Sequence, residues 1–138
     1  MKFFPLKYMD VYYDEQKKLL EYRWKENSEN MTEQDYRKTV EDLLLIIRTY
    51  EPRLLLGDSR LQNFPLSLEL QKWLSEEVLQ KFMEYGVERY AFVNSNNVFI
   101  EMAYEQVFSD AMVYVEFFRD RDTAYDWLVE TEKVNTTS

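Results

Sequence analysis

The spacing of apolar residues in this 138-residue chain switches repeatedly between every second residue and every third or fourth residue. The first spacing is typical of half-buried β-strands, and the second is typical of amphipathic helices. Strands and helices that alternate along a chain build parallel sheets through helical crossovers. The pattern therefore predicts an α/β fold, and the length is that of one domain.

The first elements are two β-prone runs, at residues 11–13 and 19–24, on either side of a polar turn at residues 14–18. In the second run, apolar residues alternate with charged ones. The apolar members, which share one face, are Leu20, Tyr22 and Trp24. This arrangement predicts an antiparallel hairpin near a sheet edge, with Glu21 and Arg23 on its solvent face.

Three helices have recognisable ends. The first begins after Thr32, a good N-cap with Asp35 at the capping-box position, and ends before Pro52. The second begins after Ser67 and ends at Gly86, and the third covers residues 98–108. We expect a fourth, short helix that begins after Asp120 or Asp122 and carries Ala124, Trp127 and Leu128.

Three further strands separate these helices, at residues 53–58, 89–93 and 112–118. The run Leu54-Leu55-Leu56 is continuously apolar, which is typical of a central strand covered on both faces. The element order is therefore ββαβαβαβα, with four helices on a mixed sheet of about five strands and a leading antiparallel hairpin. We expect a single domain over residues 1–131 and a flexible C-terminal tail over residues 132–138.

Composition excludes several functions. With no Cys and no His, the chain lacks a thiol nucleophile, a His general base and the usual zinc ligands, and we expect no enzymatic activity, metal or cofactor. A net charge of -9 repels phosphate backbones, so we expect no nucleic-acid partner.

The first residues lack an apolar run of signal-peptide length. The longest apolar stretch, residues 43–47, is too short to span a membrane. The absence of Cys fits a reducing cytoplasm, where we expect the protein to be.

Polar residues at the ends of the predicted strands are the candidate site. In open α/β sheets, ligands and partners meet the carboxyl ends of parallel strands, beside helix N-termini. The candidate binding residues are Asp58, Ser59, Arg60, Ser67, Asn94 and Asn97. Each also has an ordinary structural interpretation, because Asp, Ser and Asn commonly cap helices and close turns.

Aromatic residues are unusually frequent, with 11 Tyr, 9 Phe and 3 Trp. The predicted helix at residues 98–108 is apolar nearly all round, which indicates either deep burial or a second interface. Three interpretations remain open: a large aromatic core, a self-association surface and an apolar ligand pocket.

The element order resembles that of the STAS domain, and more specifically the SpoIIAA-like, STAS/SEC14-type single-domain proteins of bacteria. The resemblance covers roughly residues 11–130. The stretches that carry it are residues 53–60, 70–74, 86–93, 105–106 and 124–128. It implies a regulatory module that acts through a protein partner, including a second copy of itself. The SEC14-type similarity implies an alternative, a carrier or sensor for a small lipophilic ligand.

The sequence departs from the family in one motif. Phosphorylatable STAS antagonists carry Asp-Ser-Ser/Thr-Gly at the start of the helix that follows the strand equivalent to residues 53–58. Here residues 63–68 read Asn-Phe-Pro-Leu-Ser-Leu, with Ser67 but neither the Asp nor the Gly. We therefore do not expect regulation by a cognate kinase.

Overall fold

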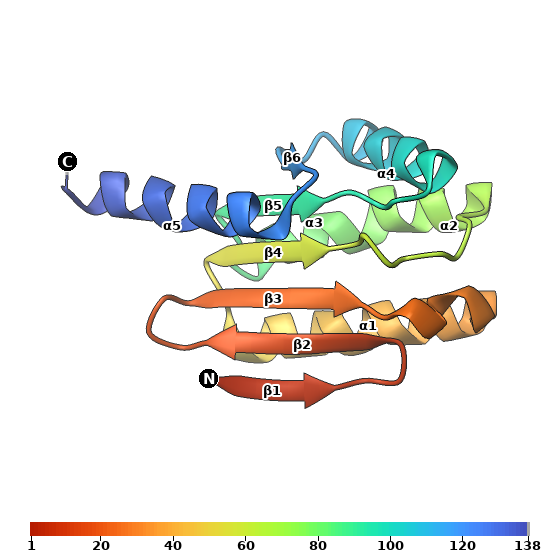
Figure 1. The fold of residues 1–138 in the computed structure, drawn as a ribbon, viewed down its shortest axis with the longest axis horizontal. Coiled ribbons are helices and arrows are strands. Elements are labelled where there is room, and N and C mark those ends of the chain that lie inside the picture. The colour runs from red at the N-terminus through yellow and green to blue at the C-terminus, as the bar shows by residue number, and fades with distance from the viewer. Residues whose placement is uncertain (138) are drawn as a thin grey trace.

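The computed structural model describes the backbone of residues 1–137 and the side chains of residues 1–130. Its centre is a six-stranded sheet whose strands follow one another in sequence order (Figure 1). The strands are β1 (Lys2–Pro5), β2 (Met9–Asp14), β3 (Leu19–Trp24), β4 (Leu54–Asp58), β5 (Arg89–Val93) and β6 (Glu116–Phe118). The β1–β2 and β2–β3 pairs are antiparallel, and β3 to β6 are parallel.

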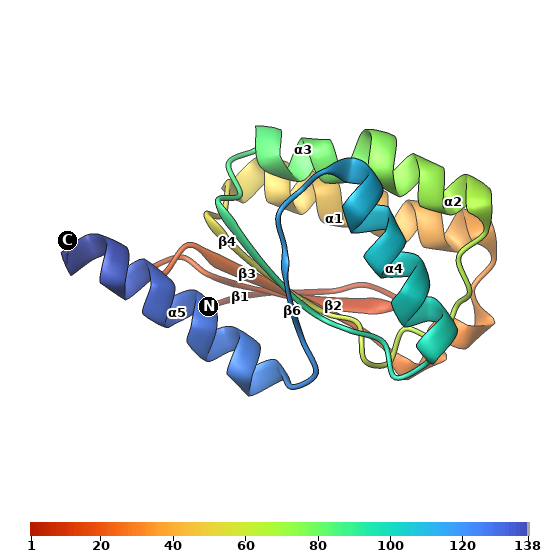
Figure 2. The same ribbon diagram turned by 90° about the horizontal axis from the view of Figure 1, so that it is seen from above.

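Helices cover the two faces of the sheet unequally. The helices are α1 (Glu33–Tyr50), α2 (Leu68–Trp73), the π-helical turn η2 (Leu74–Val78), α3 (Leu79–Glu84), α4 (Val98–Ala111) and α5 (Arg121–Thr137), and a short 3-10 turn, η1 (Glu26–Asn30), precedes α1. Figure 2 shows α1, α2, α3 and α4 on one side of the sheet and α5 alone on the other. The three crossovers between parallel strands therefore lie on one face.

This architecture confirms the mixed α/β fold with a leading antiparallel hairpin. The sheet has six strands instead of about five, because the short edge strand β1 pairs with β2. The last strand, β6, is limited to three residues, and α5 is longer than the short helix expected. Because Ser138 and the side chains of residues 131–138 lie outside the described residues, the domain end at residue 131 and the flexible tail stay predictions.

Helix α1 begins as the sequence predicts. The Thr32 hydroxyl accepts from the Asp35 backbone N–H at 3.1 Å, and the Asp35 carboxylate accepts from the Thr32 N–H at 2.9 Å. This reciprocal capping box satisfies two N–H groups that have no partner within the helix. At the far end of the next helical segment, Gly86 adopts a φ of 107°, which few other residues tolerate.

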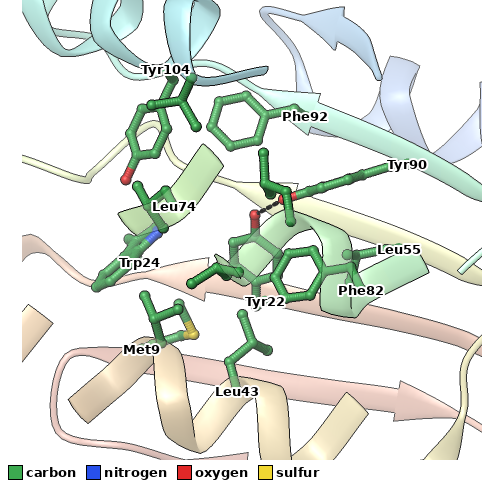
Figure 3. Packing of buried hydrophobic residues seen from close by; sticks show 14 of the residues in the cluster. Met9, Tyr22, Trp24, Leu43, Leu55, Leu74, Phe82, Tyr90, Phe92 and Tyr104 are labelled. Carbon is green, nitrogen blue, oxygen red and sulfur yellow. Dashed lines mark hydrogen bonds between the residues drawn. The ribbon is translucent and has the colours of Figure 1, made fainter. Parts of the chain in front are cut away.

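The larger core lies between the sheet and the four helical segments α1 to α4. Its residues are mostly aromatic and aliphatic, and the Tyr22 and Tyr90 hydroxyls are hydrogen-bonded to each other inside it (Figure 3). The π-helical turn η2 adds one residue to its turn and so rotates the following helix. As a result Leu79, which lies off the main apolar stripe of an ideal helix, is buried with Phe82.

The smaller core lies on the opposite face, under α5. Leu54 and Leu56 of β4 and Ala91 of β5 pack there against Ala124 and Leu128 of the helix. Leu55 of β4 points to the larger core and is also fully buried. The central-strand prediction for residues 54–56 is therefore confirmed.

Gly57 lies inside β4, within the strand predicted at residues 53–58. It pairs with Tyr22 and Phe92 on the neighbouring strands. A Cβ at this position would collide with the Tyr22 ring. Gly57 is therefore required by the close packing of Tyr22 rather than by turn geometry.

Candidate functional site

The carboxyl ends of β4, β5 and β6 meet in one surface, which we call the carboxyl edge (residues 58–60, 94–97 and 119–120). Backbone hydrogen bonds continue the sheet beyond the strands themselves. The Ser59 N–H donates to the Val93 carbonyl at 2.9 Å, and the Asn94 N–H donates to the Phe118 carbonyl at 3.0 Å. A third bond joins the Asn96 N–H to the Arg60 carbonyl at 3.2 Å. The edge is therefore a fixed scaffold for its side chains.

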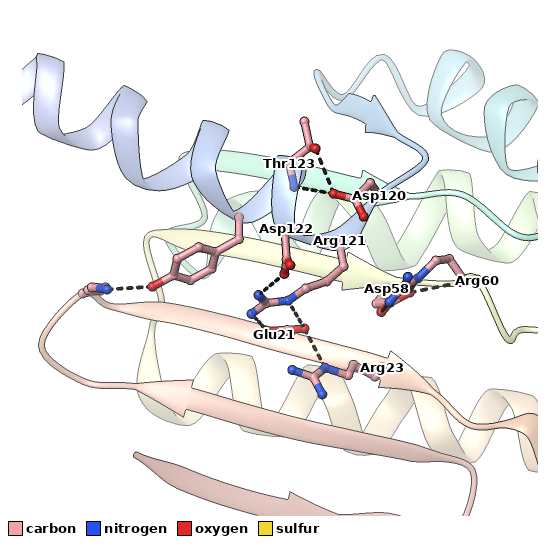
Figure 4. Close-up of polar contacts among 10 residues, drawn as sticks. Glu21, Arg23, Asp58, Arg60, Asp120, Arg121, Asp122 and Thr123 are labelled. Atoms are coloured by element: carbon pink, nitrogen blue, oxygen red, sulfur yellow. Dashed lines mark hydrogen bonds and ion pairs between the residues drawn. The ribbon is translucent and has the colours of Figure 1, made fainter.

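Asp58 and Arg60 form a bidentate ion pair at the end of β4 (Figure 4). The Arg60 guanidinium donates to both Asp58 carboxylate oxygens, from Nε at 3.0 Å and from Nη2 at 2.8 Å. The Asp58 carboxylate is almost fully buried, whereas the guanidinium is partly exposed. A bidentate pair of this kind is strong and directional. Arg60 therefore neutralises a buried charge and still presents one face to solvent.

The two candidate serines lie in different surroundings. Ser59 is fully buried, and its Oγ has no hydrogen-bond partner among the described residues. Ser67 is exposed and caps α2, where its Oγ accepts from the Leu70 N–H at 3.1 Å and donates to Glu33 at 2.7 Å. The structure therefore places Ser67 against the start of α1, outside the carboxyl edge.

The two candidate asparagines are close in sequence but differ in role. Asn97 is the N-cap of α4, and its Oδ1 accepts from the Phe99 and Ile100 N–H groups at 2.9 and 3.2 Å. Asn94 is buried, and its amide donates to a Glu105 carboxylate oxygen at 3.5 Å. Asn97 matches the ordinary capping interpretation, whereas Asn94 faces a recess.

That recess has a volume of about 160 Å³ and lies between the carboxyl edge and α4. It is lined by Asn94, Glu101, Glu105, Arg119 and two phenylalanines, Phe117 and Phe118. The Arg119 guanidinium donates to Glu101 at 3.0 Å, yet its side chain is 81% exposed. The sequence analysis missed Arg119, Glu101 and Glu105. The signal that points to Arg119 is its position directly after β6, the same relation that Ser59 has to β4 and Asn94 has to β5.

A buried polar network holds the loop between β4 and α2. The Ser28 Oγ donates to the Leu61 carbonyl at 2.9 Å, and the Ser95 Oγ donates to the Gln62 carbonyl at 2.9 Å. The Gln62 side chain, itself fully buried, donates to the Tyr104 hydroxyl at 2.9 Å. Burial raises the pKa of Tyr104 to about 12. The sequence analysis also missed this network, which fixes the loop beside the edge.

On the opposite face of the sheet, Glu21 is buried between two arginines (Figure 4). Arg121, at the start of α5, donates to both of its carboxylate oxygens at 2.6 and 3.0 Å, and Arg23 donates at 2.6 Å. Burial alone raises the pKa of Glu21, but the hydrogen bonds from the arginines outweigh it and hold the pKa below its ordinary value. The predicted solvent-facing position of Glu21 is wrong, because α5 covers this face.

Asp120 caps α5 beside this ion-pair cluster. Its carboxylate accepts from the Thr123 N–H and hydroxyl, both at 2.9 Å. The backbone hydrogen bond from Thr123, more than the nearby Arg60 guanidinium, lowers the pKa of Asp120. Its position confirms one of the two caps that the sequence allows for this helix.

The chemistry available at the edge is that of recognition by charge and hydrogen bonding. Among the described residues, no group of three or more acidic side chains is placed to hold a metal ion. Within residues 1–137, no helix combines the length and the apolar character needed to cross a membrane.

A sheet of this order, with a leading hairpin, crossovers on one face and a polar carboxyl edge, defines a STAS-type α/β domain. A family model described as SpoIIAA-like matches residues 20–129, and the chain belongs to the SpoIIAA-like family. No curated protein and no solved structure matches the chain. The family confirms the resemblance seen in the sequence.

Proposed function

We propose that the protein is a non-catalytic regulatory module that binds a protein partner through its carboxyl edge. The observation that carries this proposal is the recess beside the edge, where the exposed Arg119 guanidinium and two α4 carboxylates lie next to the buried amide of Asn94. Exposed guanidiniums on a rigid frame suit the recognition of carboxylates on another protein. The STAS-type family membership supports the same function.

The candidate residues have different parts in this proposal. Arg60 and Arg119 are the groups that contact the partner, since both present guanidinium surface to solvent. Asp58, Ser59, Asn94 and Asn97 shape and support the edge. Ser67 lies against Glu33, so we propose it as a residue at the margin of the surface.

Site-specific photo-cross-linking in the cells that make this protein tests the proposal. A photoreactive residue replaces Asn96, whose side chain is exposed at the edge, and a control replaces Lys38, which is exposed on α1. We expect one discrete protein adduct from position 96 and none from position 38, with a lower yield when Arg119→Ala is added. Equal adducts from both positions, or none from either, contradict the proposal.

A second candidate function is the binding of a small lipophilic ligand inside the larger core. An apolar cavity lies there, lined mainly by aromatic and aliphatic side chains that include Tyr22, Phe82 and Phe108. Its free volume is about 30 Å³. A cavity that binds benzene has about 150 Å³. The helical layer would therefore have to move outward to admit a ligand. Native mass spectrometry of freshly purified protein tests this candidate, because a bound lipophile adds its mass to that of the chain.

A further inference from the structure

Four tyrosines from four different elements place their side chains inside the larger core. They are Tyr22 of β3, Tyr36 of α1, Tyr90 of β5 and Tyr104 of α4, and each is at most 5% exposed. All four line the apolar cavity described above, which we call the tyrosine cavity. Packing in a core needs only the rings, so the four buried hydroxyl groups require an explanation of their own.

The hydroxyl groups form two pairs. The Tyr22 and Tyr90 hydroxyls are hydrogen-bonded to each other, and the Tyr36 and Tyr104 hydroxyls are 2.8 Å apart. The Gln62 amide donates to the Tyr104 hydroxyl at 2.9 Å. Burial raises the pKa of both Tyr22 and Tyr90, and the nearby Tyr104 raises both further. The two pairs are therefore neighbours within one cavity.

Each pair has one proton more than its hydrogen bonds use. A phenol with an ordinary pKa near 10 carries its O–H proton at pH 7. Within a pair, one hydroxyl donates to the other, and the proton of the accepting hydroxyl has no acceptor among the described residues. Gln62 donates a proton to this group and supplies no acceptor. Because a buried donor without an acceptor is costly, the two spare protons call for acceptors inside the cavity.

We propose that the tyrosine cavity binds ordered water, which accepts a hydrogen bond from each tyrosine pair. The free volume of about 30 Å³ exceeds the roughly 10–15 Å³ that one water molecule needs. Phenol oxygens also accept hydrogen bonds, so the protons of the water have acceptors in the same four hydroxyls. This site is independent of the partner proposed for the carboxyl edge.

Ordered water in this cavity also narrows the second candidate function. A lipophile that enters the cavity displaces the water, and a hydrocarbon chain alone leaves both spare protons without an acceptor. A carbonyl or carboxylate oxygen beside the apolar part of the ligand replaces the bonds that the water makes. We therefore expect any ligand of this core to carry such an acceptor.

Two measurements on the unaltered full chain test the proposal. Relaxation dispersion of water oxygen-17 counts the long-lived water molecules in solution, and the exchange of hydroxyl protons does not affect this count. A high-resolution crystal structure locates the water. We expect water density within hydrogen-bond distance of one hydroxyl in each tyrosine pair.

Variants connect the count in solution to this cavity. Tyr22→Phe/Tyr90→Phe removes one whole pair with its spare proton, and it should lose at least one long-lived water. The matched control is Tyr13→Phe, which removes the hydroxyl of another buried tyrosine, bonded to the Tyr50 carbonyl outside the cavity. Its count should equal that of the unaltered chain. If the double variant does not fold, Val78→Ile adds a methylene group to the cavity wall and should displace the water in its place.

Three outcomes overturn the proposal. The first is a crystal structure in which the cavity is dry and the spare protons point to ring faces. The second is the same count of long-lived waters in the unaltered chain and in the folded cavity variants. The third is density for an organic molecule, matched by an added mass in native mass spectrometry, which would support the second candidate function instead.

Discussion

At the scale of single residues, the ion pair at the end of β4 supports the fold beside the surface that we propose binds a partner. The Asp58 carboxylate is nearly buried, and Arg60 donates to it twice from the guanidinium and once, at 3.2 Å, from the backbone N–H. Removing one member of such a pair leaves the other charge without compensation. An Arg60 variant could therefore lose partner binding because the fold is less stable. Its free energy of unfolding has to be measured together with its binding.

We expect Arg60→Ala to lower the free energy of unfolding by about 1–3 kcal/mol, because the buried Asp58 carboxylate loses its guanidinium. The double variant Asp58→Asn/Arg60→Ala should recover part of this loss, since its buried group is neutral. Urea denaturation of the double variant and of the two single variants, Arg60→Ala and Asp58→Asn, measures the difference. If the loss in free energy of unfolding of the double variant equals the sum of the losses of the two single variants, Asp58 and Arg60 do not stabilise the fold as a pair.

Glu21 predicts a dependence of stability on pH. Its folded-state pKa is lowered, so its stabilising contribution is full above the unfolded value of about 4.3 and is lost as the pH falls through the folded value. The charged and titratable groups in contact with it are Arg23 and Arg121. Glu21→Gln should cost about 1–3 kcal/mol at pH 7 and progressively less below pH ~4.

Denaturation of the unaltered chain and the Glu21→Gln variant between pH 7 and pH 3 measures this convergence. The control is Glu88→Gln, whose partner Arg53 and own carboxylate are both largely exposed, and it should change stability little. A Glu21→Gln effect that stays constant across this range contradicts the assignment.

At the scale of elements, β4 is central to both cores. Leu55 is fully buried in the larger core, and Leu54 and Leu56 are buried in the smaller one. Leu55→Ala should therefore lower the free energy of unfolding by about 2–5 kcal/mol, through lost burial and the cavity left behind. Chemical denaturation checks this value, and a loss well below 1 kcal/mol would contradict the central position of β4.

The elements also show how far the sequence alone predicts this fold. Caps and apolar spacing are local, so the sequence predicts α1 from Thr32 and the buried strand at residues 54–56. The burial of Glu21 depends on Arg121, one hundred residues away, and no local pattern contains that contact. The role of Gly57 depends on the Tyr22 ring of another strand in the same way.

The candidate site was predictable to a similar extent. The sequence analysis places Asp58, Arg60 and Asn94 at strand ends, and the structure brings these three to one edge. Arg119 directly follows the predicted strand at residues 112–118, as it follows β6, so the sequence does contain the signal for it, but the sequence analysis did not use that signal. The loop network was missed because Ser28, Gln62 and Ser95 come from three separate segments.

At the scale of the whole molecule, a net charge of -9 decides which partners approach. The excess of 26 acidic over 17 basic residues repels a phosphate backbone, so we expect no binding to duplex DNA at physiological salt. Fluorescence anisotropy with a labelled duplex checks this expectation. Saturable binding at about 0.15 M salt would contradict the electrostatic argument.

Hydrogen–deuterium exchange tests the central claim, that the carboxyl edge binds the partner, most directly. The protein is compared alone and in complex with the protein that cross-links to position 96. We predict slower exchange in the complex at residues 58–63, 94–99 and 118–121, with unchanged exchange in α1 and β1. Protection confined to β1, β2 or the outer face of α1 would contradict the claim and place the partner on another surface.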